Sequence, residues 1–504
     1  MPKLFAYLQR RFRPEVAAGR REFFRATAAI GAGLLLSNRV SFASTDSGRR
    51  VVVIGAGFGG LACAHELRAA GYEVTVLEAR SRVGGRVLSF HDLVPGKVVE
   101  GGAELIGSNH PTWVGYAERF GLQFLDVSGE EDLEIPIYFR GHRLDRDTVS
   151  RIFTEVEETF EQLTAESQAI NADRPWESPA AAALDRRTLG EWIAQQQLSD
   201  PARQLLAILL ASDNAVANDR ASYLAMLTAI KGGGGDRYWS DSEVYRCAGG
   251  NDRLARCLAE SIGAERIRLG TPVAEICYDL AGDAASTVAV KCRDGQTFEC
   301  DEVVVATPPS TWNSIRWVPE LPPRLYRQQM GTAVKYLTAV KRPFWRDQGF
   351  SQYAVGDGLI SQTWESTDAQ WSSAERNASP AGLTAFSGGP QAERCLQLHR
   401  QLGRAQLDAQ YAAEFEQLYS GFAQEWMSSR FMDWPSEPYT LAGYSFPAPG
   451  QITSIGAALH EGVGPVHFCG EHTCYRFAGY MEGGLYSGAM LAARMAAQAA
   501  VVPN

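Results

Sequence analysis

One stretch near the N-terminus restricts the fold more than any other part of the chain. It runs over residues 49–86 and begins with an apolar segment, 51–54, that leads into a glycine-rich turn, 55–60. A helical segment follows, and a second apolar strand, 74–77, ends at Glu78. Strand, glycine turn, helix, strand and acidic residue in this order are typical of a dinucleotide-binding βαβ unit. We therefore predict an α/β fold built on a Rossmann-type parallel sheet.

Each glycine of this turn has its own physical task. Gly55 permits the tight turn, Gly57 lets a pyrophosphate approach the backbone, and Gly60 lets helix and strand pack closely. The helix, expected over 61–70, offers free N–H groups and the positive end of its dipole to a phosphate. Glu78 follows Gly55 by 23 residues and can accept hydrogen bonds from a ribose hydroxyl. This context disfavours the alternative of a glycine-rich surface turn.

A second glycine turn follows at once. Residues 77–86 read Leu-Glu-Ala-Arg-Ser-Arg-Val-Gly-Gly-Arg, so a glycine pair lies between cations and suits a second approach to the pyrophosphate. This segment resembles, in full, the signature of the flavin-containing amine oxidase family. The resemblance implies FAD as the cofactor and a monoamine-oxidase-like fold. It also implies that Ala79, Arg80, Gly85 and Arg86 bind the cofactor.

The distribution of charge excludes one class of partner. The chain has 504 residues and a net charge of −10, but residues 1–43 carry eight Lys/Arg against two Glu, a net of +6. The remainder therefore carries −16. A body this acidic argues against a nucleic-acid partner and favours cationic small molecules.

Residues 1–43 are typical of a targeting segment rather than of a folded element. The twin arginines at 20–21 precede an uncharged run over 26–36. The segment resembles a twin-arginine export signal, with Gly19 where Ser or Thr is usual. An eleven-residue run is too short to cross a hydrocarbon core of about 30 Å, which disfavours a permanent anchor. We expect a mature protein that begins near Ser44, in the periplasm or outside the cell.

The cysteines and one His/Cys cluster raise the question of metal binding. Nine cysteines, an odd number without CxxC spacing, favour thiols over a disulfide framework in a chain of this length. The segment 467–474 holds two His, two Cys and one Glu, which is compatible with zinc. Its Gly470-Glu471 pair, however, matches the second flavin motif of the family. We therefore expect no metal.

The length of the chain allows two domains. We predict an FAD-binding domain made of three separate segments, 49–122, 245–316 and 441–504. The second, α+β substrate domain is predicted to comprise 123–244 and 317–440.

Hydrophobic periodicity gives a coarse secondary structure inside these ranges. Apolar residues recur at helical spacing over 148–168 and 188–229, with a loop signal at 173–176 between them. Segments 267–278 and 287–305 are strand-rich.

Further cofactor contacts are implied by the resemblance alone. The segment that contains Gly102, Ala103 and Glu104 passes the flavin ring in the family. The backbone of Val273 contacts the adenine there.

Lys335 is the first residue that could take part in the chemistry. In a strand over 331–340 both faces around it are mostly apolar, so the lysine lies inside the fold or at a pocket wall. The pattern alone favours an ordinary lysine that extends its ammonium to the surface. The resemblance favours a catalytic role, because the family has a lysine here before a Lys-x-Pro-Phe-Trp motif, which residues 341–345 match. There it holds a water against flavin N5 and assists the reaction with dioxygen.

The C-terminal part supplies the other half of the predicted site. By resemblance, Glu471 binds the ribityl or phosphate side of the cofactor, and Met481 begins a helix whose positive end faces the flavin. Tyr444 and Tyr480 match the two aromatic rings that flank the substrate amine. Tyrosines in such positions are by default half-buried packing residues, so this assignment depends on the resemblance.

Two positions predict finer properties. Mitochondrial relatives have a flavin-linked cysteine where this chain has Gly443, so we expect non-covalent FAD. Amino acid oxidases of the superfamily bind the substrate carboxylate with an arginine in the segment where this chain has Glu104. A carboxylate there would repel a substrate carboxylate and attract a second cationic group. The alternative is that Glu104 pairs with a nearby arginine and never meets the substrate.

The resemblance covers residues 49–500 and implies an exported FAD-dependent oxidase. It would convert a primary amine, either a monoamine or a di- or polyamine, to an imine and then an aldehyde, and reduce dioxygen to hydrogen peroxide. An L-amino acid oxidase and a tryptophan 2-monooxygenase-like enzyme are the enzymatic alternatives, and a non-catalytic flavin-binding protein is the alternative of another class. The sequence also leaves a homodimer open.

Overall fold

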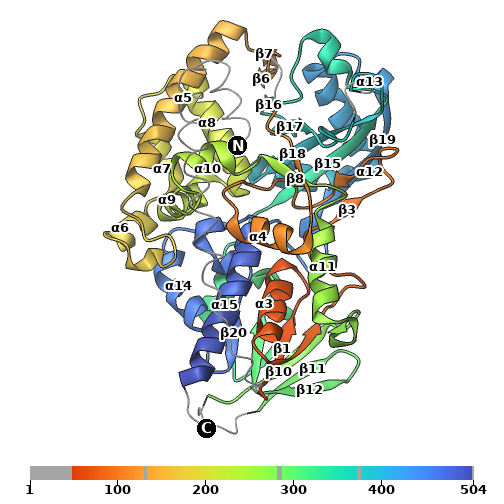
Figure 1. Ribbon diagram of the computed structural model, residues 1–504. Helices are drawn as coiled ribbons and strands as arrows, with labels where there is room; N and C mark the ends of the chain where they lie inside the picture. Colours follow the sequence, from red (N-terminus) through yellow and green to blue (C-terminus); the bar gives the residue numbers. More distant parts are fainter. Residues whose placement is uncertain (1–47, 130–132, 281–286, 372–375, 502–504) are drawn as a thin grey trace.

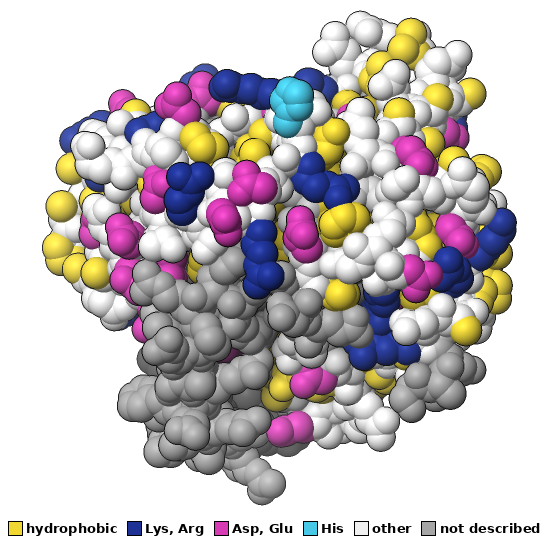
Figure 2. Space-filling view, turned by 90° about the horizontal axis from the view of Figure 1, so that it is seen from above, with side chains coloured by type: hydrophobic (Ala, Val, Ile, Leu, Met, Phe, Trp, Pro, Cys, Tyr) yellow, Lys and Arg dark blue, Asp and Glu magenta, His cyan; other side chains and the backbone are white. Residues whose placement is uncertain are grey.

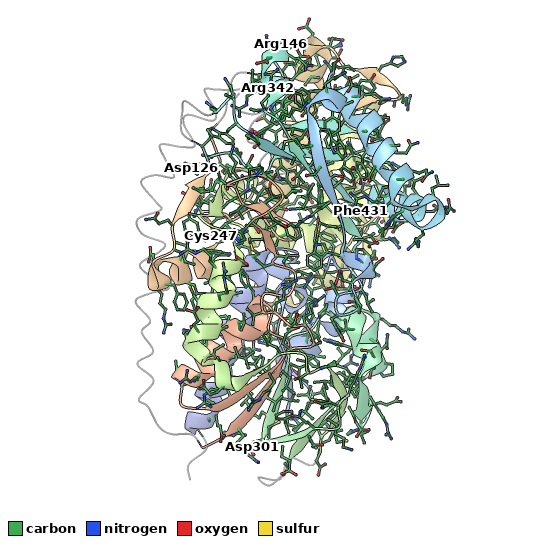
Figure 3. All side chains as sticks on the ribbon, turned by 90° about the vertical axis from the view of Figure 1, so that its right-hand side faces the viewer. Asp126, Arg146, Cys247, Asp301, Arg342 and Phe431 are labelled. Atoms are coloured by element: carbon green, nitrogen blue, oxygen red, sulfur yellow. The ribbon has the colours of Figure 1, made fainter. Side chains whose placement is uncertain are left out.

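The computed structural model describes residues 48–129, 133–280, 287–371 and 376–501. Two units lie one above the other in Figure 1, and α4 lies between them. Figure 3 shows the same long axis from the side, with Asp301 near one end and Arg146 and Arg342 at the other. The leader, with its predicted export signal, is outside the described residues.

The lower unit is built on a five-stranded parallel sheet, so the predicted Rossmann-type arrangement is confirmed. Its order is β20-β13-β1-β2-β9, and the strands are Val466–Phe468, Glu302–Val305, Arg50–Ile54, Glu73–Leu77 and Ile267–Arg268. Helix α3, Phe58–Ala69, connects β1 to β2. It begins three residues before the predicted start at 61, because the turn needs only the residues up to Gly57, which is the N-cap.

Both faces of this sheet are covered, which explains why β1 is a continuous apolar run. Val51 and Val53 pack on the face covered by α3, by α11 (Asp252–Ile262) and by α15 (Met481–Val501). Val52 and Ile54 pack on the opposite face, against a four-stranded sheet. That sheet has the order β12-β11-β10-β14, with strands Thr297–Cys300, Val288–Cys292, Val273–Cys277 and Arg316–Val318.

The upper unit contains a seven-stranded sheet whose strands come from distant parts of the chain. Its order is β19-β15-β18-β17-β16-β6-β7. The strands are Trp426–Asp433, Ala333–Val340, Ala381–Gly388, Gln362–Glu365, Ala354–Gly356, Ile137–Phe139 and His142–Arg143. Helices α12 (Pro390–Leu418) and α13 (Phe422–Glu425) pack against this sheet around β15 and β18.

A group of helices completes the upper unit on the other side (Figure 1). Its members share one apolar core with residues of β6. They are α5 (Arg146–Ser167), α6 (Ala181–Arg186), α7 (Leu189–Ala194), α8 (Asp200–Asn214), α9 (Tyr223–Gly232) and α10 (Asp236–Asp241). The helical periodicity over 148–168 and 188–229 thus corresponds to α5 and to α7, α8 and α9. The mixed α/β fold is confirmed, whereas the domain boundaries stay a prediction.

The remaining elements join the two units. They are α4 (Pro111–Phe120), α14 (Gln451–Glu461), β3 (Ser89–Phe90), β4 (Val99–Glu100), β5 (Phe124–Asp126) and β8 (Tyr245–Cys247). Acidic and basic side chains are interspersed on the face shown in Figure 2. Within the described part of the chain, no helix combines the length and the apolar character needed to cross a bilayer.

Candidate active site

One cavity connects the dinucleotide turn of the lower unit with the sheet and helices of the upper unit. Its lining includes Gly57 and Glu78 at one end and Lys335, Tyr444 and Tyr480 at the other. The residues predicted from the sequence therefore line one cavity, although they come from segments more than 400 residues apart in the chain. With the exception of Gly60, all of the predicted site residues line this cavity.

Gly60 has a packing role instead. A Cβ on Gly60 would lie 1.9 Å from the carbonyl oxygen of Gly55, so only glycine allows α3 to start this close to β1. Gly55 itself has a φ of +103°, a conformation that favours glycine. The positive φ of Gly55 and the lack of space for a Cβ at Gly60 explain why the sequence pattern has glycine at these two positions.

The two glycine turns lie directly against each other. The N–H of Gly84 donates to the carbonyl of Ala56 at 2.8 Å, and a Cβ on Gly85 would lie 3.2 Å from the Cα of Gly57. Side chains at these positions would fill the space in front of the turn. The backbone therefore forms a narrow cradle at the N-terminus of α3, which suits a pyrophosphate.

Glu78 is held at the end of β2 by two backbone donors. Its Oε2 accepts the N–H of Ala56 at 2.7 Å, and its Oε1 accepts the N–H of Arg80 at 2.8 Å. Each carboxylate oxygen can accept a second hydrogen bond, so Glu78 is still able to bind a ribose hydroxyl. Ala79 and Arg80 line the same end of the cavity, and Arg80 Nη2 donates to Thr440 Oγ1 at 2.7 Å.

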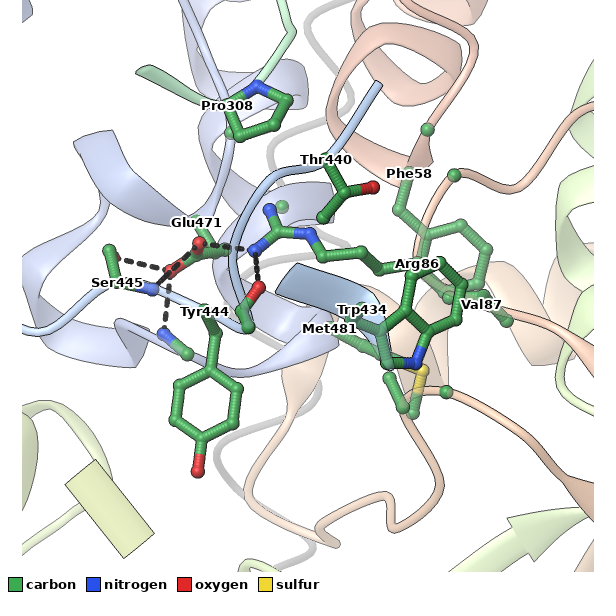
Figure 4. A pocket seen from close by; sticks show the side chains of 18 of the residues that line it. Phe58, Arg86, Val87, Pro308, Trp434, Thr440, Tyr444, Ser445, Glu471 and Met481 are labelled. Carbon is green, nitrogen blue, oxygen red and sulfur yellow. Dashed lines mark hydrogen bonds and ion pairs between the residues drawn. The ribbon is translucent and has the colours of Figure 1, made fainter. Parts of the chain in front are cut away.

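Arg86 and Glu471 join the second glycine turn to the C-terminal motif (Figure 4). Arg86 Nη1 donates to Glu471 Oε1 at 2.9 Å and to the carbonyl of Gly443 at 2.7 Å. Glu471 also accepts the hydroxyl of Ser445 and the N–H of Gly479. Burial alone would raise the pKa of Glu471, but Arg86 and these donors bring the pKa below its ordinary value. Its contact with the ribityl side of the cofactor stays a prediction.

Lys335 is buried on β15, and three acceptors surround its ammonium. Nζ lies 2.6 Å from Glu104 Oε2, 2.8 Å from the carbonyl of Gly102 and 3.3 Å from the carbonyl of Glu100. A Cβ on Gly102 would lie 1.8 Å from the carbonyl oxygen of Arg86, so glycine is required there. The interpretation of Lys335 as a lysine that extends its ammonium to the surface is therefore wrong, because the ammonium is buried in the protein.

Glu104 does not have the free carboxylate that one of our expectations requires. Its second oxygen, Oε1, lies 2.8 Å from Arg246 Nη2 and accepts the indole N–H of Trp364 at 2.9 Å. Burial raises the pKa of Glu104, but the charges of Lys335 and Arg246 outweigh it, so the pKa is lowered. The arginine pair that the alternative expects is present, whereas the attraction of a second cationic group of the substrate stays a prediction.

Arg246 is a residue that the sequence analysis missed. It lies in the buried strand β8 and also contacts the carboxylate of Asp368 and the carbonyl of Glu365. Its only signal in the sequence is a charged residue between Tyr245 and Cys247 in a short extended segment. These contacts enclose the guanidinium, so it does not face the cavity as a carboxylate-binding arginine would.

Tyr444 and Tyr480 lie close together at the upper end of the cavity. The hydroxyl of Tyr444 donates to the carbonyl of Asp213 at 2.7 Å, and Gly479 packs against the Tyr444 ring, with a built Cβ 2.9 Å from Cδ2. Burial raises the pKa of both tyrosines well above its ordinary value, so both phenols are neutral.

His110, also missed, supports Tyr480. The two ring centroids are 5.2 Å apart in an edge-to-face arrangement. The His110 Nδ1 accepts the N–H of Gly107 at 2.8 Å, and burial lowers the pKa of His110 to about 3. The imidazole therefore acts as a neutral packing group behind the tyrosine.

Three further predicted residues, Val273, Met481 and Ala103, line the cavity. Val273 begins β10 and Met481 begins α15, and both are buried. Ala103 follows Gly102, with its N–H donating to the carbonyl of Arg86 at 3.1 Å.

The His/Cys segment at 467–474 has structural contacts. His467 Nε2 lies 2.7 Å from Glu302 Oε2, and His472 packs edge to face on Trp312. All nine cysteines are free thiols. In the residues with described positions, no group of three or more His, Cys, Asp or Glu is arranged to hold a metal ion.

Comparison with known proteins gives one consistent result. The family model described as flavin containing amine oxidoreductase matches residues 58–496. The chain is 27% identical over 464 residues to "Probable flavin-containing monoamine oxidase A" of Dictyostelium discoideum, covering 87% of this chain and 95% of that protein. It is 25% identical over 460 residues to an L-amino acid dehydrogenase of Synechocystis, and the match covers 87% of this chain and 92% of that protein.

Solved structures show the same fold. A putrescine oxidase variant superposes with a TM-score of 0.78 at 24% identity, over 89% of this chain and 99% of that one. The cyclohexylamine oxidase of Brevibacterium oxydans superposes with a TM-score of 0.75 at 24% identity and the same coverage. With a family match over most of its length, this chain belongs to the flavin-containing amine oxidoreductase family and is an enzyme that uses FAD.

Proposed function

We propose that this protein oxidises a primary amine that lacks an α-carboxylate, and that dioxygen is the electron acceptor. The observation that carries the proposal is the continuity of the cavity. A dinucleotide cradle at Gly57 and Gly85 opens into a space with Lys335 and two neutral tyrosines. One continuous cavity with this lining supports the proposal, because a bound flavin and a small substrate would share it.

The chain's residues fit FAD by their chemistry. The glycine cradle and the N-terminus of α3 would hold the pyrophosphate, and Glu78 would hold a ribose hydroxyl. Val273, Gly102 and Met481 would border the rings, because they line the cavity on either side of the cradle. The bound FAD supplies a hydride acceptor for the carbon next to the amine nitrogen.

Tyr444 and Tyr480 would position the amine. Their rings offer negative π-faces to the nitrogen, and their phenols stay neutral because the pKa of each is raised by burial. The hydrogen bond from Tyr444 to Asp213 and the packing of Tyr480 on His110 fix the two rings. Oxidation of the C–N bond yields an imine, which water converts to a carbonyl compound and an ammonium ion.

Lys335 would assist the reduction of dioxygen. Its ammonium lies in the cavity wall and is held by Glu104 and by the carbonyl of Gly102. A fixed positive charge at this place favours the negative charge that develops on oxygen as it is reduced to hydrogen peroxide.

The main alternative substrate class is an L-amino acid. The relative from Synechocystis, named an L-amino acid dehydrogenase, supports this class. Against it, Arg246 is enclosed by Glu104, Asp368 and the carbonyl of Glu365, so its guanidinium is not presented to a substrate carboxylate. A solved relative described as a putrescine oxidase bound to putrescine supports the amine class.

Peroxide release from the purified protein tests the proposal. We compare the rate of peroxide release with three amines, putrescine, tyramine and phenethylamine, and with two amino acids, L-phenylalanine and L-tryptophan. We expect turnover of at least one amine and little turnover of the amino acids; preference for the two amino acids over all three amines would overturn it. A non-catalytic flavin protein would keep its yellow colour on anaerobic mixing with every compound, whereas an oxidase loses it.

We also propose that the protein is exported. The support is the pattern of residues 1–43, with twin arginines before an uncharged run. Mass spectrometry of the protein from a periplasmic or culture fraction should give an N-terminus near Ser44. An intact leader on protein found solely in the cytoplasm would contradict this proposal.

A further inference from the structure

Glu482 is a buried carboxylate two residues after Tyr480 in the chain. It is the second residue of α15 and is 0% exposed. Its Oε1 accepts the backbone N–H of Thr112 at 2.9 Å, and its Oε2 accepts the backbone N–H of Trp113 at 2.9 Å. Both donors belong to the first turn of α4. The carboxylate therefore binds the start of one helix to the start of another.

Helix α4 has no capping side chain from its own segment. Its N-cap is His110, whose side chain accepts no hydrogen bond from the first turn. Pro111 follows and has no N–H, so Thr112 and Trp113 carry the first free donors of the helix. A carboxylate at a helix N-terminus accepts such donors in charge-assisted hydrogen bonds and is favoured by the helix dipole. Glu482 thus takes the place of a local cap.

A second contact joins the same two segments of the chain. The ring of His110 packs edge to face on Tyr480, with the centroids 5.2 Å apart. The two N–H groups that Glu482 accepts follow His110 by two and three residues, and Glu482 follows Tyr480 by two. The hydrogen bonds of Glu482 therefore fix the spacing at which the His110 ring meets Tyr480.

We propose that Glu482 is a positioning residue for amine oxidation, and that it acts through His110 on the ring of Tyr480. This inference rests on the proposed function and adds a residue to it. Tyr480 lines the cavity, whereas Glu482 is not among the lining residues. A shift of about 1 Å in a group that positions the substrate slows the reaction strongly, because the reacting atoms need a narrow geometry. Glu482 therefore affects flavin reduction by the amine without touching the amine.

The test measures the two half-reactions of the FAD-loaded enzyme separately in Glu482→Gln. The amide keeps the size of the carboxyl group but has a single acceptor oxygen, so one N–H of α4 loses its partner. Anaerobic stopped-flow mixing with an amine that the wild type oxidises should show flavin bleaching slowed on the order of 10-fold. Reoxidation by dioxygen should be unchanged, because Lys335 lies on β15 and pairs with Glu104.

The pH of these assays matters, because burial raises the pKa of Glu482 to about 7. Measurements at about pH 8.5 keep the carboxylate of the wild type ionised.

Glu414→Gln is the matched control. Glu414, on α12, also accepts two successive backbone N–H groups, those of Leu359 at 2.7 Å and Ile360 at 2.9 Å. Neither of these residues lines the cavity. Both variants should lose unfolding free energy and keep their FAD content, whereas bleaching should slow in Glu482→Gln alone. A wild-type rate of bleaching in Glu482→Gln, or equal slowing in both variants, would overturn the inference and leave amine oxidation intact.

A double-mutant cycle tests the route through Tyr480. In a Tyr480→Leu background the ring is already absent, so adding Glu482→Gln should slow bleaching little further. Additive effects of the two substitutions would show that Glu482 does not act through this ring and would overturn the inference.

His110→Asn approaches the same contact from α4 and serves if Glu482→Gln folds poorly. Asn is a favourable N-cap residue, so α4 keeps its start while the ring that meets Tyr480 is lost. This variant should also combine slow bleaching with unchanged reoxidation, and a wild-type rate of bleaching would overturn the inference. Failure of every amine to bleach the wild-type flavin would instead reject the proposed function, and this inference with it.

Discussion

Lys335 Nζ lies 2.6 Å from Glu104 Oε2 inside the protein, and Arg246 holds the other oxygen of the same carboxylate at 2.8 Å. One acid thus compensates two cations, and the lysine presents a fixed ammonium to the cavity. Because the lysine lies on β15, the arginine on β8 and the acid in the loop after β4, this network ties three distant segments of the chain together at the predicted site.

Replacing the lysine separates catalysis from cofactor binding. Lys335→Met keeps a side chain of similar length and should still bind FAD, since Glu104 retains Arg246 and Trp364 as partners. Reoxidation of the reduced enzyme by dioxygen should slow on the order of 100-fold, the range typical of a positioned polar catalytic group. Stopped-flow mixing with dioxygen measures this rate. Lys341→Met, on an exposed residue just after β15, is the control, and an unchanged reoxidation rate in Lys335→Met would reject the assigned role.

Replacing the acid should destabilise the fold. Glu104→Gln leaves the buried Lys335 without its carboxylate partner and leaves Arg246 with Asp368 alone, which costs about 3–5 kcal/mol of unfolding free energy. Since the pKa of Glu104 is lowered in the folded state, its stabilisation is present above the unfolded pKa of about 4.3 and is lost as pH falls through the lower folded pKa. The difference between wild type and variant should therefore shrink below about pH 4.

Denaturant unfolding of both proteins as a function of pH measures this effect. Glu275→Gln is the matched control, because Glu275 also holds two cations, Lys291 and Arg316, but at the surface. Its effect should be much smaller, since water screens exposed ion pairs. Similar losses of unfolding free energy in both variants would show that burial does not strengthen the ion pairs of Glu104.

The contribution of Glu100 to the free energy of unfolding should have the opposite dependence on pH. Burial raises its pKa to about 8, even though it accepts hydrogen bonds from Ser89 Oγ and from the N–H of Asn251. Between the unfolded pKa of about 4.3 and this folded value, the folded state binds the extra proton, so stability falls as pH rises. Compared with Glu100→Gln, the wild type should lose about 1.4 kcal/mol per pH unit across that window.

The measurement is thermal or urea unfolding of Glu100→Gln and wild type between pH 5 and 8. The expected result is a wild-type stability that declines relative to the variant. A constant difference across this range would show that the Glu100 carboxyl ionises as easily in the folded protein as in the unfolded chain.

The flavin should be released when the protein is denatured. Gly443 has no sulfur, and a side chain there would collide with Ala333, since a built Cβ lies 2.9 Å from the Ala333 Cβ. Acid or heat should therefore transfer all FAD absorbance to the filtrate. Gly443→Cys should lower the yield of folded, flavin-loaded protein because of this contact. Fluorescent flavin that stays with the denatured wild-type chain in a gel would contradict the prediction.

The sequence alone determined the dinucleotide unit. Its strand, glycine turn, helix and second strand are contiguous, so spacing and hydrophobic pattern contain the information that local geometry needs. Gly55 and Gly60 show why: one requires a positive φ, and the other leaves no space for a Cβ. The pattern also predicted that Lys335 lies on a strand with two mostly apolar faces, but it did not decide that the ammonium is buried.

Only the tertiary structure decided which groups compensate each other. Glu104 meets Arg246 from 142 residues away and Lys335 from 231 residues away, and Asp213 reaches the hydroxyl of Tyr444 across 231 residues through its backbone. The seven-stranded sheet likewise joins β6 to β16 across more than 200 residues. Local propensity does not encode such pairings, because they depend on how two separately formed units bury their surfaces against each other. The sequence therefore predicted the dinucleotide cradle, and the packing of the two units decided that the Glu104 carboxylate is compensated by Lys335 and Arg246.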